Sequence, residues 1–304
     1  MTATCPALEM YSAIIQQGGT LRERTTLSLT KSILSVLIVA AMGCGGGSDG
    51  SSDENGSACN SIGYGNSLKV AAGEQCLADS SSDTSSVVKL FLFDGGSLIG
   101  SCTGTVISST AVLTAAHCFE DADSVVVRVV TNGTKVDVPS SRIVVHPGYV
   151  LLEDGFPDPG VVFNDAAIVH TSLQLPVAPV PILLSRAPEV GEASIVAGYG
   201  QIENNGPAVE DVVAGRAVIR IVTDNHLRID FRGGESHPCQ GDSGGALFIE
   251  EDSGLVIVGV VSQSDPSISE EQVCSKGDMT LYTNTQSTNV SNFISSQVPD
   301  VAVR

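Results

Sequence analysis

The chain has 304 residues, including 32 glycines and no tryptophan, and its formal net charge is −19 at pH 7. This length allows one large domain or two small ones in addition to export segments. We do not expect a nucleic-acid partner, because binding a polyanion depends on clustered Lys and Arg, and we interpret the acidity as an aid to solubility.

Residues 1–43 are interpreted as an N-terminal extension and a signal segment. Three basic residues between positions 22 and 31 precede the apolar run Ser32–Met42, which is too short to span a bilayer comfortably. The run leads to Cys44, which resembles the cysteine that is lipidated in bacterial lipoproteins, although Ala41 stands where leucine is usual. We expect export, as a secreted protein or as a bacterial cell-envelope lipoprotein tethered to the membrane through Cys44. Plain signal cleavage without a lipid remains an alternative.

Residues 44–69 are expected to be a flexible tether and pro-segment, and residues 70–304 the main domain. Gly and Ser dominate the stretch 45–57, a composition typical of solvated linkers. Apart from Cys5 and Cys44, six cysteines remain: Cys59, Cys76, Cys102, Cys118, Cys239 and Cys274. An even number in an exported chain predicts disulfides, but six cysteines allow 15 pairings, so spacing alone does not select one.

Short runs of β-branched residues between turn-forming residues predict strands through most of the domain. The first series comprises Val87–Phe93, Gly104–Ser108, Ala111–Ala115, Ser124–Val130 and Ile143–His146. The second comprises Ser194–Ala197, Ala217–Val222, Leu227–Phe231, Ala246–Glu250, Leu255–Ser262 and Met279–Thr283. A proline-rich segment at 175–188 separates the two series and is expected to be an extended crossing segment.

One helix is predicted near the C-terminus. Ser287 or Thr288 can cap it, and Val290, Phe293 and Ile294 are spaced to share one face. Two all-β lobes followed by a terminal helix are therefore the expected architecture.

The pentapeptide GDSGG at 241–245 is the sharpest chemical signal in the chain. A serine hydroxyl is a poor nucleophile unless a base removes its proton, and flanking glycines allow two N–H groups to face one oxygen. By itself the motif also fits a Gly/Ser turn or the nucleophile elbow of α/β hydrolases. In that fold the histidine follows the serine, whereas all five histidines here precede Ser243, which excludes the elbow.

Two further segments supply the partners that a serine nucleophile needs. His117 in TAAHC provides a base, and Asp165 in NDAAI provides a carboxylate beside apolar residues. The order His, Asp, Ser is that of one known catalytic triad arrangement. With these three motifs in this order, the chain resembles the chymotrypsin/trypsin family of serine peptidases from about Val70 to the C-terminus. The resemblance implies an all-β fold of two antiparallel six-stranded barrels with a short C-terminal helix.

The resemblance also implies roles for further residues. It pairs Cys102 with Cys118 and Cys239 with Cys274. We also expect a bridge between Cys59 and Cys76. The oxyanion hole is expected at the backbone N–H groups of Gly241 and Ser243, and Ser262 is expected to hydrogen-bond Asp165.

In the family, the aspartate before the nucleophile pairs with a newly freed N-terminal amine, and Asp242 holds that position. We expect activation by cleavage between Lys69 and Val70. If Cys59 is bridged to Cys76, the pro-segment would stay attached after that cleavage.

The substrate is expected to be a protein or peptide. His237 occupies the position at the base of the primary pocket, with Ser264 and Thr280 on its wall. Trypsin-like enzymes carry Asp at the base, so cleavage after Arg or Lys is not predicted. A cationic His237 would favour an acidic substrate side chain, and a neutral one would form an uncharged wall.

Two other functions are compatible with these motifs. The chain could be a catalytically silent relative that serves as a binding module, or an esterase that uses the same groups on a different acyl substrate. No cofactor or metal is expected, because the exported cysteines lack close C-x-x-C pairs. The oligomeric state is not predicted.

Overall fold

The computed structural model describes residues 57–70, 73–152, 161–203, 205–232, 235–264 and 274–304. Strands predominate, and their local sequences show why. In β6 (Ser124–Thr131), Val125, Val127 and Val129 are buried while the intervening side chains point outward. Such alternation places one face of a strand in the core and the other toward solvent.

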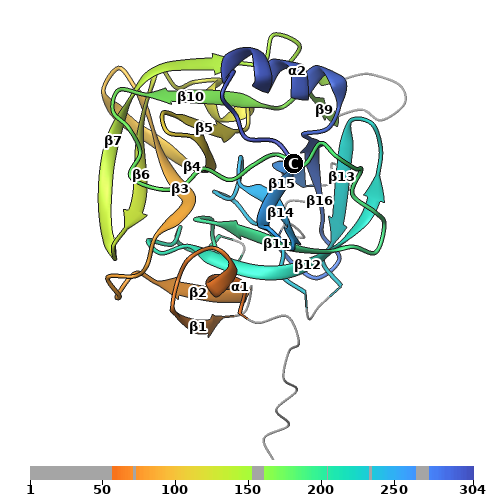
Figure 1. The fold of residues 1–304 in the computed structure, drawn as a ribbon, viewed down its shortest axis with the longest axis horizontal. Coiled ribbons are helices and arrows are strands. Elements are labelled where there is room, and N and C mark those ends of the chain that lie inside the picture. The colour runs from red at the N-terminus through yellow and green to blue at the C-terminus, as the bar shows by residue number, and fades with distance from the viewer. Residues whose placement is uncertain (1–56, 71–72, 153–160, 204, 233–234, 265–273) are drawn as a thin grey trace, which may run out of the picture. The chain divides into compact units, whose positions relative to one another are not determined.

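The first half of the domain closes into a six-stranded antiparallel barrel (Figure 1). Its strand order is β10-β5-β4-β3-β6-β7, and pairing between β10 and β7 completes the ring. The members are β3 (Ser85–Asp94), β4 (Ser97–Ser108), β5 (Ala111–Thr114), β6, β7 (Thr134–Val145) and β10 (Ala167–Thr171). A separate two-stranded sheet of β8 (Val150–Leu152) and β9 (Val161–Phe163) lies in the connection between β7 and β10.

The second half forms another six-stranded ring, in the order β12-β11-β14-β15-β16-β13, closed by pairing between β12 and β13. The members are β11 (Ala193–Gly198), β12 (Val213–Val222), β13 (His226–Asp230), β14 (Ala246–Glu251), β15 (Gly254–Ser264) and β16 (Met279–Asn284). The two predicted barrels are therefore confirmed, and every predicted strand overlaps an observed one.

The described part of the expected tether or pro-segment is folded against the second barrel. Helix α1 (Ala58–Ser61) is followed by β1 (Asn66–Val70), which forms a hairpin with β2 (Gly73–Leu77). Strand β2 continues the sheet by pairing with β12. Cys59 and Tyr64 are 0% and 2% exposed, so this segment contributes to the hydrophobic core. The expected signal run and Cys44 lie outside the described residues.

The extended crossing segment and the terminal helix were predicted correctly. Residues 175–188 link the barrels, with the N–H of Val180 donating to Val106 in the first and that of Leu183 to Ile257 in the second. Helix α2 (Thr288–Gln297) begins after Ser287, whose Oγ accepts from the N–H of Val290. Phe293 of α2, which is drawn at the top of Figure 1, packs against the ring of His146 just after β7, with ring centroids 4.8 Å apart.

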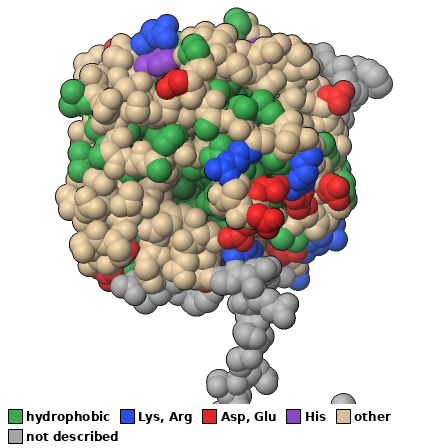
Figure 2. Space-filling model, viewed as in Figure 1, with side chains coloured by type: hydrophobic (Ala, Val, Ile, Leu, Met, Phe, Trp, Pro, Cys, Tyr) green, Lys and Arg blue, Asp and Glu red, His purple; other side chains and the backbone are tan. Residues whose placement is uncertain are grey.

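Acidic and basic side chains lie next to one another on the face shown in Figure 2. Among the described residues, Arg186 pairs with Glu192 and Glu251, and Arg216 pairs with Glu250. Exposed pairs of this kind contribute little stability, so the core and the disulfides hold the fold. The described helices include none with the length and apolarity needed to cross a membrane.

Candidate active site

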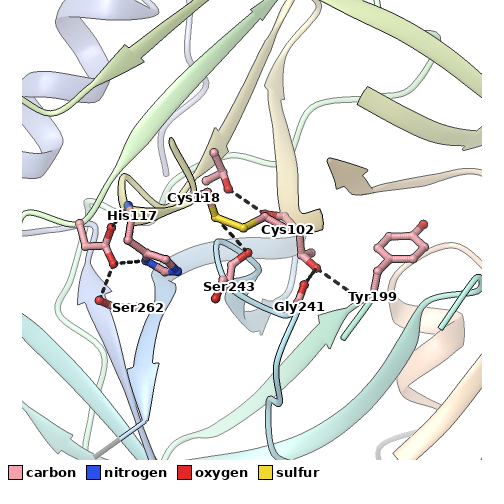
Figure 3. Close-up of a disulfide and its surroundings, with 10 residues drawn as sticks. Cys102, His117, Cys118, Tyr199, Gly241, Ser243 and Ser262 are labelled. Carbon is pink, nitrogen blue, oxygen red and sulfur yellow. Dashed lines mark hydrogen bonds and ion pairs between the residues drawn. A yellow bond between two sulfur atoms is a disulfide. The ribbon is translucent and has the colours of Figure 1, made fainter. Parts of the chain in front are cut away.

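His117 lies at the end of β5, where a short 3₁₀ turn (η2, His117–Phe119) begins. Ala115 and Ala116 before it are buried, and these small side chains allow the turn to pack closely against the barrel. Cys118 is bridged to Cys102 of β4, with an S–S distance of 2.02 Å. The bridge ties the turn to a core strand, so the imidazole is carried on a rigid support (Figure 3).

Asp165 lies between β9 and β10 and is fully buried. Its Oδ1 accepts the backbone N–H of His117 at 2.9 Å, and its Oδ2 lies 2.7 Å from Nδ1 of the imidazole. The hydroxyl of Ser262, on β15 of the other barrel, donates to the same Oδ2 at 2.6 Å. The chain turns here through Asn164, which has a left-handed φ of 52° and anchors its amide on the carbonyl of Gly148. The structure therefore brings together an imidazole, a carboxylate and a hydroxyl.

Burial lowers the pKa of His117, but the hydrogen bond and charge of Asp165, together with the charge of Glu120, raise it above its usual 6.5. A raised pKa means a more basic ring. An imidazole held in one orientation by a carboxylate on Nδ1 presents Nε2 as a proton acceptor.

Ser243 lies between His117 and Gly241 in Figure 3 and is partly exposed. Its carbonyl accepts the N–H of Thr103 at 2.9 Å, which fixes the backbone of the turn. A Cβ at Gly244 would lie 2.0 Å from Oγ1 of Thr114, so only glycine fits there. No hydrogen bond between the Ser243 hydroxyl and the His117 ring occurs in the described part of the chain. Catalytic hydrogen bonds are often long before substrate binds.

The backbone N–H groups of Gly241 and Ser243 differ from those of their neighbours in whether they have a hydrogen-bond acceptor. The N–H groups of Asp242, Gly244 and Gly245 all donate to backbone carbonyls. Within the described ranges, no acceptor is found for the N–H of Gly241 or of Ser243. Gly241 has a φ of 96°, a conformation that favours glycine. Two free donors on either side of one residue are suited to bind an oxygen that carries negative charge.

Asp242 points away from the serine, into the second barrel. Its carboxylate accepts N–H groups from Gly200 and Cys239, both at 2.8 Å. A Cβ at Gly198 would lie 2.0 Å from this carboxylate, and one at Gly200 2.6 Å from it, so the two glycines enclose it. Burial raises the pKa of Asp242 to about 6, against the lowering effect of the two N–H groups.

A cavity of about 20 Å³ adjoins Asp242 and is also lined by Val213, Ala214 and His237. A space of this size holds about one water molecule. No basic side chain among the described residues pairs with the Asp242 carboxylate. The cavity is therefore an enclosed, negatively charged site next to the strand that β2 joins.

The two other disulfides link Cys239 to Cys274 and Cys59 to Cys76, with Cα atoms 5.0 and 5.4 Å apart. The first joins the segment before Ser243 to the strand connection beyond β15. The second joins α1 to β2. No group of three or more His, Cys, Asp or Glu arranged to hold a metal ion occurs in the described ranges.

Comparison with known proteins decides the family. A family model described as trypsin matches residues 79–294, which is more than two thirds of the chain. The chain belongs to the trypsin family.

Three curated relatives show how this trypsin-family chain compares with known members. It is 32% identical over 193 residues to Serine protease 56 of Homo sapiens, a match covering 54% of this chain and 30% of that protein. It is 29% identical over 192 residues to the venom serine protease Bi-VSP of Bombus ignitus, covering 53% and 51%. Brachyurin of Leptuca pugilator is 31% identical over 173 residues, covering 48% and 70%. The matches to the first two span about half of those proteins or less.

The three residues expected at the primary pocket also lie together in this trypsin-family fold. Nε2 of His237 lies 2.7 Å from Oγ1 of Thr280, and the imidazole stacks on Phe231 with ring centroids 5.6 Å apart. Ser264 donates to Asp278 at 3.4 Å, and Nδ1 of His237 lies 3.8 Å from the same carboxylate. Burial lowers the pKa of His237, although the charge of Asp278 opposes this.

Sequence reasoning missed Asp278. It is fully buried, and its carboxylate accepts the N–H groups of Cys274 and Met279 at 2.7 Å each. The only local signal is a Gly-Asp pair before a strand, which also describes an ordinary turn. Its contact with His237 depends on the tertiary fold.

Proposed function

We propose that this trypsin-family chain is a serine endopeptidase in which Ser243 is the nucleophile, His117 the general base and Asp165 the carboxylate that orients the base. One observation carries the proposal: the buried Asp165 carboxylate holds Nδ1 of His117 at 2.7 Å, beside a partly exposed serine. This contact requires segments 48 residues apart to converge, which a simple Gly/Ser turn would not need.

The proposed chemistry follows from these positions. As the hydroxyl oxygen of Ser243 attacks the scissile carbonyl carbon, Nε2 of His117 takes the hydroxyl proton. The imidazolium then gives that proton to the leaving amine as the C–N bond breaks, which produces an acyl-enzyme. Water, deprotonated by the same imidazole, hydrolyses the ester and restores Ser243. Asp165 stabilises the imidazolium without accepting the proton.

The oxyanion is proposed to be held by the N–H groups of Gly241 and Ser243. Both donors lack an acceptor among the described residues, so neither must break a protein hydrogen bond to serve. Removing one such donor in other enzymes costs about 3–4 kcal/mol of transition-state stabilisation.

Hydrolysis of an unfolded protein substrate by wild type and by Ser243→Ala tests the proposal. Loss of the nucleophile is expected to reduce kcat by about a millionfold, the scale measured for a serine triad. Thermal unfolding should be unchanged, because the Ser243 side chain forms no hydrogen bond to any residue in the described ranges. Equal activity of the two proteins would refute the assignment. Wild type that stays inactive after cleavage of the Lys69–Val70 bond would favour the silent relative.

Activation is proposed to follow cleavage of the Lys69–Val70 bond. The backbone of Lys69 lies opposite that of Glu74 in the β1–β2 hairpin, and β2 pairs with β12 next to the cavity at Asp242. After cleavage, residues 70–72 could extend about 10 Å from Gly73. That reach would let the new amine approach Asp242, and the cavity must widen to admit it. Sequencing the N-terminus of the active enzyme tests this, and a start other than Val70 would refute it.

The Cys59–Cys76 disulfide supports the proposal that the pro-segment remains attached after activation, because it joins the two sides of that bond. Export and a lipid tether at Cys44 stay proposals. Electrophoresis of the cleaved protein with and without reductant tests retention. Mass spectrometry of the N-terminal peptide from a bacterial host tests lipidation.

For specificity we propose that His237 is a neutral wall of the primary pocket. Its lowered pKa and its contact with Thr280 favour an uncharged imidazole at neutral pH. This weighs against recognition of acidic side chains by charge. A peptide library in which cleavage after Glu or Asp dominates at pH 7 would contradict it.

A further inference from the structure

Val162 joins the strand that leads into Asp165 to the opposite barrel by two hydrogen bonds. Val162, in β9, donates its N–H to Oε1 of Gln263 at 3.1 Å. Its carbonyl lies 2.7 Å from Nε2 of His226. Gln263 belongs to β15 and His226 to β13, both strands of the second barrel. Both backbone polar groups of Val162 are thus bound by side chains 64 and 101 residues away.

An irregularity in β15 makes one of these contacts compatible with the contact to Asp165. Successive side chains of a regular strand point to opposite faces. Here the register of β15 against β16 shifts between Val261 and Gln263, and such bulges redirect side chains. Ser262 reaches the Asp165 carboxylate while Gln263 reaches the backbone three residues before it. One short stretch of β15 therefore contacts both the carboxylate and the strand that delivers it.

His226 is held in an orientation suited to its contact. Its ring packs edge-on against Phe163, with centroids 5.1 Å apart. Burial lowers the pKa of His226, while the Val162 carbonyl and the charge of Asp165 act in the opposite direction. A neutral ring carries one proton, and a carbonyl partner requires that proton on Nε2.

The sheet to which Val162 belongs is separate from the hydrogen-bonded ladders of both barrels. Within the described ranges, β8 and β9 pair only with one another. An isolated two-stranded hairpin is marginally stable in water. Contacts from outside the hairpin are therefore needed to fix β9, and only two residues separate Val162 from Asp165.

We propose that Gln263 and His226 are positioning residues, which fasten Val162 to the second barrel and thereby keep Asp165 within hydrogen-bonding distance of His117. This inference rests on the proposed peptidase function. Misplacement of a catalytic group by about 1 Å can reduce a rate about a hundredfold. Each contact is expected to account for part of such a loss.

Kinetics of His226→Ala and Gln263→Ala test the proposal. We expect kcat to fall about tenfold in each, the effect of losing one hydrogen bond, while KM changes less. His226→Gln retains an N–H donor and should recover most of the loss. His170→Ala is the matched control, because His170 lies in β10 and bonds Arg142 instead, so its kinetics should equal those of wild type.

The pKa of the His117 imidazole provides a second measurement, which does not require turnover. The pKa of His117 is raised by Asp165 and, more weakly, by Glu120, whose carboxylate also accepts the hydroxyl of Tyr149. Loosening Asp165 should lower the pKa of the His117 imidazole, as measured by NMR, in His226→Ala and Gln263→Ala but not in His170→Ala. A wild type that is inactive after cleavage would refute the proposed function, whereas these titrations would still report on positioning. A wild-type His117 pKa in both alanine variants would overturn the inference, whatever their stability.

Discussion

Two carboxylates near Ser243, the fully buried Asp165 and the partly buried Asp242, differ in how their charges are compensated. Asp165 is bound by an imidazole, a backbone N–H and the hydroxyl of Ser262. Asp242 receives only backbone N–H groups from within the described residues, and its pKa is raised to about 6 by burial. The contrast indicates that the imidazole of His117 already has its carboxylate partner, whereas the described residues offer no cationic side chain to Asp242.

Replacing the compensated carboxylate should have the largest effect. Asp165→Asn keeps the size of the side chain but removes the charge that sets the imidazole tautomer. We expect kcat to fall about ten-thousandfold, as for the same change in a known triad, with little loss of stability. Steady-state kinetics together with thermal unfolding measure both. A loss below about tenfold would show that Asp165 is not the orienting group.

Replacing the uncompensated carboxylate should have an intermediate effect on the cleaved enzyme. Asp242→Asn cannot form an ion pair with a new amine, so the donors at Gly241 and Ser243 would be poorly placed. We expect a 100- to 1,000-fold loss of kcat, about the value of one oxyanion donor. The pKa of His117, measured by NMR, should stay at its wild-type value. A shift of the His117 pKa would contradict the claim that Asp242 acts independently of the His117–Asp165 pair.

The uncleaved chain offers a test of Asp242 through stability. Its carboxyl pKa is raised from 3.8 to about 6, so between these values the folded state binds more protons than the unfolded state. The free energy of unfolding should therefore fall from this group as pH rises from about 4 to about 6. Denaturant unfolding of wild type and Asp242→Asn measures the difference. An identical pH dependence in both would contradict the burial of an uncompensated charge.

Removing the disulfide beside the proposed activation bond tests the attachment of α1. Cys59 and Cys76 are separated by 17 residues, and opening a loop of about this size costs about 3 kcal/mol of unfolding free energy. In Cys59→Ser/Cys76→Ser we expect that loss, and release of the pro-segment under denaturing electrophoresis once the chain is cleaved. If the pro-segment stayed attached in this variant, which lacks the disulfide, cleavage between positions 59 and 76 would be refuted.

The smallest effect on kcat is expected from removing the Ser262 hydroxyl, which donates to Asp165. Ser262→Ala removes one of its hydrogen bonds and leaves both bonds to His117. A loss of about tenfold in kcat is expected, because one hydrogen bond contributes about 1 kcal/mol. A loss as large as that of Asp165→Asn would mean that Ser262 has a more direct role.

The sequence predicted the parts of the fold that depend on local pattern. Valine-rich alternation located strands such as β6, and the Ser287 cap with its apolar face located α2. The hairpins β1–β2 and β8–β9 were missed, because they are short and depend on tertiary contacts. Strand β10 was also missed, since its apolar run of Ala167–Val169 is too short to show a period.

The site divides in the same way. Motifs led to the proposed roles of His117, Asp165 and Ser243, because these residues lie in short segments whose types and order carry the chemistry. The structural contacts of Asp278, His226 and Gln263 could not be predicted. Each touches a partner distant in sequence, and Gln263 does so beside a β-bulge that no local pattern indicates.

The rate at which a fluorophosphonate probe labels the cleaved enzyme, followed by mapping of the labelled peptide, tests the central claim most directly. The account predicts a single label on Ser243. It also predicts a rate that falls as pH decreases through a His117 pKa above 6.5, because only the neutral imidazole accepts the proton. Labelling of another residue, or a rate on Ser243 that is unchanged in His117→Ala, would contradict it.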